Sequence, residues 1–253
     1  MLPETMPVCP VRGSVIYPTM VMPIDAGRPI SIRAIDEALA RDRVLLIVSQ
    51  RDKEVETPRP SDLFEVGTAC NILKMRKNPD GSVQVLVQAF ARVRVREWLD
   101  LGDHLEARGE VLADEPGEPI LVKALVREVK DKFQALLKEG KYLAPEVAQF
   151  ILNLEDPSQL ADYVAFHMDF RLEDKQKVLE TANVAERLRA VLVLLEAELA
   201  LIETQRRIQQ QVKEEIDRNQ REYFLREQMK AIQRELHGEE GEQEVEELRR
   251  KLE

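Results

Sequence analysis

Two kinds of hydrophobic pattern divide this chain at about residue 115. Before that point, apolar residues occur in short runs separated by turn residues, and after it they recur every three or four positions. Twelve of the 13 prolines precede residue 150, and no glycine lies between Gly140 and Gly238. Proline and glycine interrupt helices, so the first half is expected to contain strands and turns and the second half helices. The pattern therefore predicts an α+β protein.

Residues 1–115 have the pattern of a small β-rich lobe. The apolar stretches 66–75 and 83–90 flank the turn signal Asn78-Pro79-Asp80-Gly81, which predicts a hairpin. In residues 92–96 arginine and valine alternate. Because side chains along a strand point to opposite faces in turn, the valines are expected to face inward and the three arginines outward.

A buried strand, a further strand and one helix complete this lobe. The run 44–48 is apolar throughout, as expected for a strand buried on both faces, and 105–112 can add another strand. A helix is expected to begin with Ser31 as its N-cap and to carry Ile35 and Leu39 on its apolar face. We expect the sheet to curl into a barrel-like form.

Residues 116–182 are predicted to form a helical lobe. After the proline- and glycine-containing linker 115–119, apolar residues recur at helical spacing from Leu121 to Leu137. Shorter helices are expected at 145–154 and 157–168, each with a proline that suits the first helical turn.

Residues 183–237 are free of helix breakers and predict one long helix. Its apolar stripe is diluted after Ile202 and then resumes out of phase, so the first part is expected to pack on its own lobe and the second to project toward a partner helix. Residues 238–253 are acidic and are expected to begin a helical segment of a longer protein. The predicted partner contacts are Tyr223, Phe224, Leu225, Met229, Ile232 and Leu236.

Charge and cysteine content narrow the class of protein. The net charge is −10 at pH 7, which opposes nucleic acid as the main partner. Cys9 and Cys70 alone make neither a disulfide framework nor a metal site. The N-terminus lacks the features of a signal peptide, and no apolar run approaches membrane-spanning length. A cytoplasmic location without membrane contact is expected.

The sequence offers no support for catalysis by this chain. It contains no glycine-rich P-loop, and no dinucleotide-binding glycine motif follows a strand. The three histidines, His104, His167 and His237, are far apart, without the spacing of a zinc site. We therefore expect no catalytic residue, no metal and no cofactor in this chain.

Residues 17–24 form the most suggestive candidate for binding. This stretch combines methionine, tyrosine and proline, and methionine surfaces adapt to varied apolar partners. Its side chains could instead simply close the end of the barrel. Leu112 is expected to border a cleft between the lobes. The candidate substrate-binding residues are Tyr17, Met20, Met22, Pro23, Ile24 and Leu112.

An ordered set of motifs resembles the N-terminal region of bacterial Lon proteases. The set includes Pro10-Val11-Arg12-Gly13, Tyr17-Pro18, Met22-Pro23-Ile24 and Gly27-Arg28-Pro29. It continues with Asp62 to Thr68, the Pro79-Asp80-Gly81 hairpin and Gln220 to Ile232.

The resemblance implies a fold and a biological setting. The implied fold is a PUA-like pseudo-barrel, then a helical lobe and a long helix. Lon proteases are ATP-dependent AAA+ serine proteases that assemble as hexamers and degrade damaged proteins in quality control and stress. The ATP, the Mg²⁺ and the Ser-Lys dyad belong to domains that this sequence does not resemble. The implied function is therefore recognition of exposed apolar segments of unfolded or damaged proteins.

Two other interpretations stay open. PUA-like lobes can bind RNA, and Arg92, Arg94 and Arg96 could form a face for nucleic acid. Alternatively, the chain could be a structural spacer that only sets the geometry of a ring.

Overall fold

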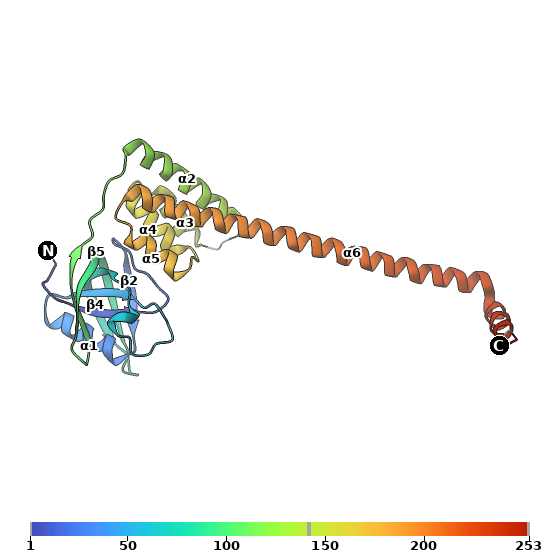
Figure 1. Cartoon of the computed structure of the whole chain (residues 1–253), viewed down its shortest axis with the longest axis horizontal. Helices are drawn as coiled ribbons and strands as arrows, with labels where there is room; N and C mark the ends of the chain where they lie inside the picture. Colours follow the sequence, from blue (N-terminus) through green and yellow to red (C-terminus); the bar gives the residue numbers. More distant parts are fainter. Residues whose placement is uncertain (1, 141–142, 252–253) are drawn as a thin grey trace. The chain divides into compact units, whose positions relative to one another are not determined.

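In a computed structural model, residues 2–140 and 143–251 are described, without the side chains of residues 236–247 and 249. Contacts divide the chain into two units, Met1–Leu199 and Ala200–Glu253. The first unit contains all the strands and five of the helices (Figure 1). The prediction of an α+β fold, with a curled sheet followed by a helical region and a long helix, is confirmed.

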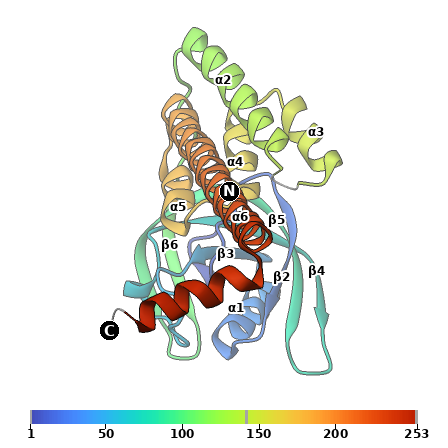
Figure 2. The same ribbon diagram turned by 90° about the vertical axis from the view of Figure 1, so that its right-hand side faces the viewer.

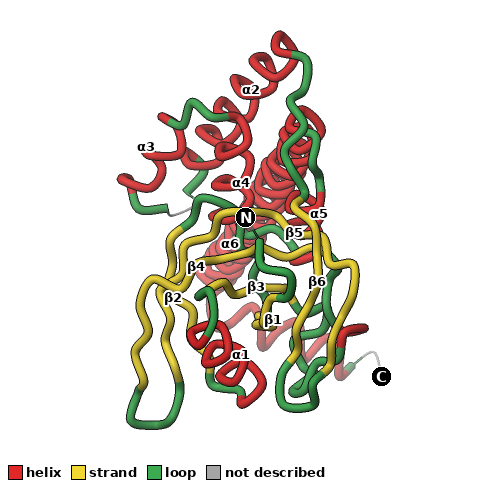
Figure 3. The backbone as a smooth tube through the Cα atoms, turned by 90° about the vertical axis from the view of Figure 1, so that its left-hand side faces the viewer, coloured by secondary structure: helices red, strands yellow, loops and turns green. Residues whose placement is uncertain are grey.

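Five strands of the first unit close into a barrel. Hydrogen-bonded pairing runs from β5 to β4, β3, β1 and β6, and β6 pairs again with β5. Strand β2 adds to the first half of β5 and forms an edge of the sheet, and Figure 3 shows the strands curling around one another. The strands are β1 (Met6–Val11), β2 (Val21–Ala26), β3 (Val44–Ser49), β4 (Val66–Lys77), β5 (Val83–Asp100) and β6 (Leu105–Val111).

The apolar pattern explains this closure. All of β3 is buried, and its alternate residues enter two different core clusters, with Leu45 in one and Leu46 in the other. The two strands expected at 83–90 and 92–96 form the single strand β5, which is long enough to pair with β2, β4 and β6. A register shift between Val95 and Glu97 interrupts the pairing of β5 with β6. A bulge of this kind allows a strand to bend, which suits the closure of the barrel at this point.

Helix α1 (Pro29–Ala40) covers one of the two clusters of the barrel. The prediction that Ser31 caps this helix is wrong, because Arg28 occupies the N-cap and Pro29 begins the helix. Proline suits that position since its φ is already helical and it has no N–H to satisfy. Ser31 is buried in the first turn.

The helical lobe follows the barrel and is here defined as helices α2 to α5 with α6 up to Leu199. Helices α3 and α4 begin at the two prolines expected to start them, α2 begins at Pro119 of the predicted linker, and α5 is an addition that the sequence pattern did not predict. Phe133, Leu160 and Leu188 lie in the core of the lobe, and Figure 2 shows α4 and α5 lying on the barrel side of α2. The helices are α2 (Pro119–Lys138), α3 (Pro145–Asn153), α4 (Pro157–His167), α5 (Leu172–Glu180) and α6 (Val184–Arg250).

The second unit consists of α6 from Ala200 onward. Its described side chains are mostly exposed, including five of the six predicted partner contacts. The side chain of the sixth, Leu236, lies outside the described residues. The five exposed residues are Tyr223, Phe224, Leu225, Met229 and Ile232.

We predict that Gly67→Ala destabilises the barrel. Gly67 lies in β4 against β3, and an added Cβ would lie 2.5 Å from the carbonyl oxygen of Ile47 and 2.7 Å from Cγ2 of Val48. Overpacking of this kind lowers the free energy of unfolding by about 1–3 kcal/mol. Urea unfolding followed by the fluorescence of Trp98 measures the change.

The matched control is Gly27→Ala. No atom lies within 4 Å of a Cβ placed at Gly27, so this variant should unfold at nearly the same urea concentration as the parent chain. Equal midpoints for the Gly67 and Gly27 variants would contradict the close packing of β3 on β4.

Candidate functional site

A buried network of charged side chains joins the barrel to the helical lobe. Arg92 of β5 donates from Nη2 to both carboxylate oxygens of Asp162 on α4, at 2.5 and 2.6 Å, and both side chains are almost fully buried. Arg187 of α6 is completely buried, and its guanidinium donates to Asp114 at 2.6 Å and to Ser158 at 2.7 Å. Ser158 in turn donates to Asp114.

The two carboxylates of this network have opposite pKa shifts. Burial raises the pKa of Asp162 to about 6, although the charges of Arg92 and Arg187 act against that rise. Burial also raises the pKa of Asp114, but hydrogen bonds from Arg187 and Ser158 outweigh it, and the net shift is downward. Both groups are therefore carboxylates at neutral pH, which suits bidentate pairing with arginine.

The expectation that Arg92 faces outward is wrong. Arg92 lies on the same face of β5 as Arg94 and Arg96, as the alternation predicts, but the helical lobe covers this end of the face. Arg96 is exposed and paired with Glu110. The three arginines therefore do not form one open surface for nucleic acid.

The segment that leads into β2 is held by the same junction. The side chain of Tyr17 is fully buried, and its hydroxyl donates to the carbonyl oxygen of Lys175 on α5 at 2.8 Å. Thr19 has a φ of 70°, a left-handed conformation that is uncommon for a residue with a side chain. Its backbone N–H donates to Ala89 on β5 at 2.9 Å. These bonds fix the position at which Met20 meets the helices.

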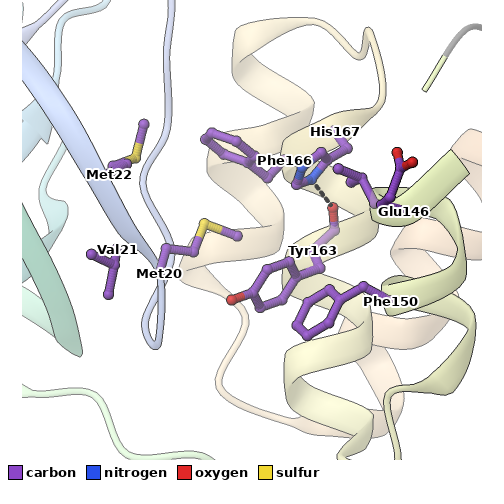
Figure 4. A pocket seen from close by; sticks show the side chains of 9 residues that line it. Met20, Val21, Met22, Glu146, Phe150, Tyr163, Phe166 and His167 are labelled. Atoms are coloured by element: carbon purple, nitrogen blue, oxygen red, sulfur yellow. Dashed lines mark hydrogen bonds between the residues drawn. The ribbon is translucent and has the colours of Figure 1, made fainter. Parts of the chain in front are cut away.

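An apolar pocket, here called the junction pocket, lies between the start of β2 and helices α3 and α4. Its volume is about 370 Å³. Figure 4 shows the side chain of Met20 pointing toward the rings of Phe150 and Tyr163, with Phe166 and His167 on the same wall. The remaining lining residues are Val21, Met22, Glu146 and Val147.

The wall formed by the helices is an aromatic cluster. The ring centroids of Phe150 and Tyr163 are 5.2 Å apart in an edge-to-face arrangement, and those of Phe166 and His167 are 5.0 Å apart. His167 Nδ1 lies 3.1 Å from the carbonyl oxygen of Tyr163. Burial and the nearby charge of Lys175 lower the pKa of His167, so this ring is neutral at pH 7.

The candidate residues from the sequence are placed at several different positions. Met20 and Met22 line the junction pocket. Pro23 is exposed in β2, whereas Ile24 is 8% exposed and belongs to the barrel core, and Tyr17 is fully buried. Direct contact of a ligand with Tyr17 would therefore require the structure to open, whereas Ile24 lines a further pocket of about 310 Å³ together with Met22 and Pro23.

Leu112 lines a separate pocket of about 300 Å³, here called the Leu112 pocket. This pocket also lies at the lobe junction, between the segment around Thr19 and helix α4. Arg92, Asp114 and Asp162 line it as well, so its wall includes the charged network. The contact of these predicted residues with a substrate stays a prediction.

Sequence reasoning missed the aromatic wall of the junction pocket. Only 5% of the chain is aromatic, yet Phe150, Tyr163, Phe166 and Phe170 fall within a short stretch. This local enrichment was an available signal. Its pairing with Met20 could not be predicted, because it depends on how the helices dock on the barrel.

The described residues offer neither a metal site nor a membrane-spanning helix. Within them, no group of three or more histidine, cysteine, aspartate or glutamate side chains has a geometry that could hold a metal ion. In that same part of the chain, no helix combines the length and apolarity needed to cross a membrane.

The barrel, the helical lobe and the pocket between them define a two-lobed domain whose fold occurs in solved N-terminal domains of Lon proteases. The N-terminal domain of Mycobacterium avium complex Lon protease is similar, with a TM-score of 0.63 and 27% identity over 76% of this chain and 98% of that one. A Lon N-terminal domain protein from Xanthomonas campestris shares the fold, with a TM-score of 0.51 and 12% identity over 75% of this chain and 97% of that one.

The chain belongs to the family of the ATP-dependent protease La (LON) substrate-binding domain, whose model matches residues 5–197. It is 39% identical to the Lon protease of Brevibacillus choshinensis over 98% of this chain and 32% of that protein. It is 40% identical to the Lon protease of Escherichia coli K12 over 97% of this chain and 32% of that protein. The chain thus spans about a third of the length of these relatives.

We predict that Arg187→Met loosens the junction of the two lobes. The change leaves Asp114 and Asp162 with one arginine in place of two, and removing one partner from a buried ion pair costs about 3–5 kcal/mol. Urea unfolding measures the loss. Arg189→Met makes the same chemical change at an exposed position of the same helix and should have little effect. Equal losses would indicate that the network does not stabilise the fold.

Proposed function

We propose that the junction pocket binds exposed apolar segments of unfolded or damaged proteins and that the chain is a substrate-recognition module. One observation carries this proposal: the side chain of Met20, just before β2, faces an aromatic wall on α3 and α4, and the partly exposed Val21 and Phe150 line the same pocket. Val21 is 55% exposed and Phe150 is 48% exposed. A native protein hides such side chains of its own, whereas an unfolded segment can place one between them.

The residue types suit varied apolar partners. Methionine is unbranched and polarizable, so Met20 and Met22 can adjust to side chains of different shape and can contact aromatic rings. The rings of Phe150 and Tyr163 supply apolar area with little rotational freedom to lose. A pocket of about 370 Å³ suits one or two side chains, so each binding event is expected to be weak.

Membership of the family supports a further proposal about the larger protein. We propose that the full-length protein is an ATP-dependent serine protease in the cytoplasm. Six copies of this chain would then deliver substrates to an AAA+ ring, in which the missing domains supply the ATP and Mg²⁺ sites. Six weak sites on one assembly raise the effective affinity for a long unfolded chain through avidity.

We propose a separate role for the second unit. Its exposed apolar residues include Tyr223, Phe224, Leu225, Met229 and Ile232. In the full-length assembly these side chains would pack against helices of neighbouring subunits, which would remove them from water. Leu236 is assigned to the same surface from the sequence alone.

We predict that Val21→Asp and Phe150→Asp each weaken binding of a destabilised model protein by at least about tenfold. The expected size follows from the roughly 1.5–3 kcal/mol that a buried apolar side chain contributes. Titration of the chain with a fluorescently labelled, permanently unfolded protein, followed by anisotropy, gives the dissociation constants.

The matched control is Val193→Asp, because Val193 is 63% exposed on α6 and does not line the pocket. It adds the same charge to the same lobe and should leave binding unchanged. The pocket assignment fails if all three variants bind equally well. Circular dichroism confirms that each variant is folded before it is titrated.

A further inference from the structure

A third pocket at the lobe junction has a different chemistry. It lies between the start of β4, at one end of the barrel, and helix α5. Its volume is about 580 Å³. Arg51, Arg94, Arg96 and Lys177 contribute positive charge, and Glu65, Glu173 and Glu180 contribute negative charge. We call it the arginine pocket. None of its lining residues lines the junction pocket.

Strands β4 and β5 and helix α5 build the floor of this pocket. Val66 of β4 and Arg94 of β5 are paired across the barrel sheet. The buried amide of Gln176 on α5 donates from Nε2 to the carbonyl oxygen of Val66 at 2.8 Å and to Glu180 at 2.9 Å. These bonds hold α5 at a fixed place beside the arginines, so the pocket is part of the fold rather than a gap between loose side chains.

Arg94 differs from its neighbours on the same face of β5. Arg92 is paired with Asp162 and Asp114, and Arg96 is paired with Glu110. Among the described residues, the half-buried side chain of Arg94 makes no hydrogen bond and no ion pair, although Glu110 lies opposite it on β6 and the charge of Arg94 helps to lower the pKa of that carboxyl. A partly desolvated guanidinium without an acceptor gains from any anion that reaches it.

Arg51, which is exposed, supplies a second guanidinium in the same pocket. Its Nε donates to the carbonyl oxygen of Leu63 at 3.0 Å, and its guanidinium lies 4.5 Å from the ring centre of Phe64. Stacking on the ring fixes the orientation of the charge, while no carboxylate among the described residues is paired with it. Arg51 and Arg94 therefore offer planar donors of the kind that bind a carboxylate or a phosphate.

The glutamates of the pocket decide between these two anions. Glu65, Glu173 and Glu180 lie in the same lining, and the whole chain carries a net charge of −10. A polyphosphate or a nucleic acid would bring many negative charges toward these groups. A peptide brings a single carboxylate among neutral amides, so the repulsion is much smaller.

We propose that the arginine pocket binds a carboxylate carried by a peptide segment, through Arg94 and Arg51. The carboxylate can be an aspartate or glutamate side chain or the C-terminal group of the peptide. This site is separate from the apolar junction pocket, and the inference does not depend on the function proposed for that pocket.

The test is an NMR titration of the ¹⁵N-labelled chain with three short peptides that lack large apolar residues. One has an internal glutamate and an amidated C-terminus, one has a free C-terminal carboxylate and no acidic side chain, and one has neither charge. We expect saturable shifts of the Arg94 and Arg51 Nε–H signals with at least one of the first two peptides and none with the third. The comparison of the first two identifies the source of the carboxylate.

Arg94→Gln should weaken this binding by about tenfold or more, as expected for loss of a hydrogen bond between charged groups. Arg76→Gln is the matched control, since Arg76 is an exposed arginine of the same hairpin and does not line the pocket. It should leave the affinity within about twofold, because an exposed charge at a distance is largely screened by salt.

Three results would overturn the proposal. They are the absence of shifts at millimolar peptide, equal weakening by the Arg94 and Arg76 variants, and tighter binding of a short oligonucleotide or inorganic phosphate at the same residues. The peptides lack large apolar groups, and Phe150→Asp should leave their binding unchanged. A negative result with these peptides would therefore contradict the proposal for the arginine pocket and leave the proposal for the junction pocket untouched.

Discussion

The ion network of Arg92, Asp162 and Arg187 is the contact on which the geometry of both lobes depends. Asp162 is the point where an arginine from the barrel and an arginine from α6 meet on α4. Tyr163 is the next residue of α4, and Phe166 follows one turn after Asp162, so the bond that fixes Asp162 also fixes the aromatic wall of the junction pocket. The Leu112 pocket is lined by Arg92 and Asp162 themselves. The same residues therefore hold the two lobes together and position the walls of both pockets.

A charged network is a costly way to join two lobes, because each group must leave water. Paired arginines fix orientation as well as providing attraction, since a planar guanidinium can donate to carboxylates in only a few arrangements. We infer that the network sets the orientation of the lobes while Val21 and Phe150 keep open apolar surface. Tyr17 contributes to the same orientation through its bond to α5.

The sequence predicted local elements well, and it failed where one element covers another. The hairpin at residues 78–81, the fully buried strand β3 and the helices that begin with proline follow from local rules. Alternation correctly placed Arg92, Arg94 and Arg96 on one face, but it could not reveal that α4 and α5 cover the end of that face. Helix α5 was missed because it is short and mostly polar, with few apolar residues to mark its buried side. Tyr17 and Ile24 belong to the same segment as Met20 and Met22, yet they turn inward, because a residue on a strand faces either the core or the surface.

The three arginines of β5 show how position changes the role of one residue type. Arg92 is buried between two carboxylates and holds the lobes, and Arg96 is exposed and paired with Glu110. Arg94 lies between them and, among the described residues, makes no ion pair and no hydrogen bond. The contacts of Arg92 and Arg96 explain the presence of these two arginines through the fold alone, whereas the fold does not explain the charge of Arg94. The junction pocket offers apolar contacts and the arginine pocket offers positive charge, and an unfolded polypeptide carries both apolar side chains and carboxylates. If both proposals hold, one segment can be recognised by two weak contacts of different chemistry, which selects for more than exposed hydrophobicity.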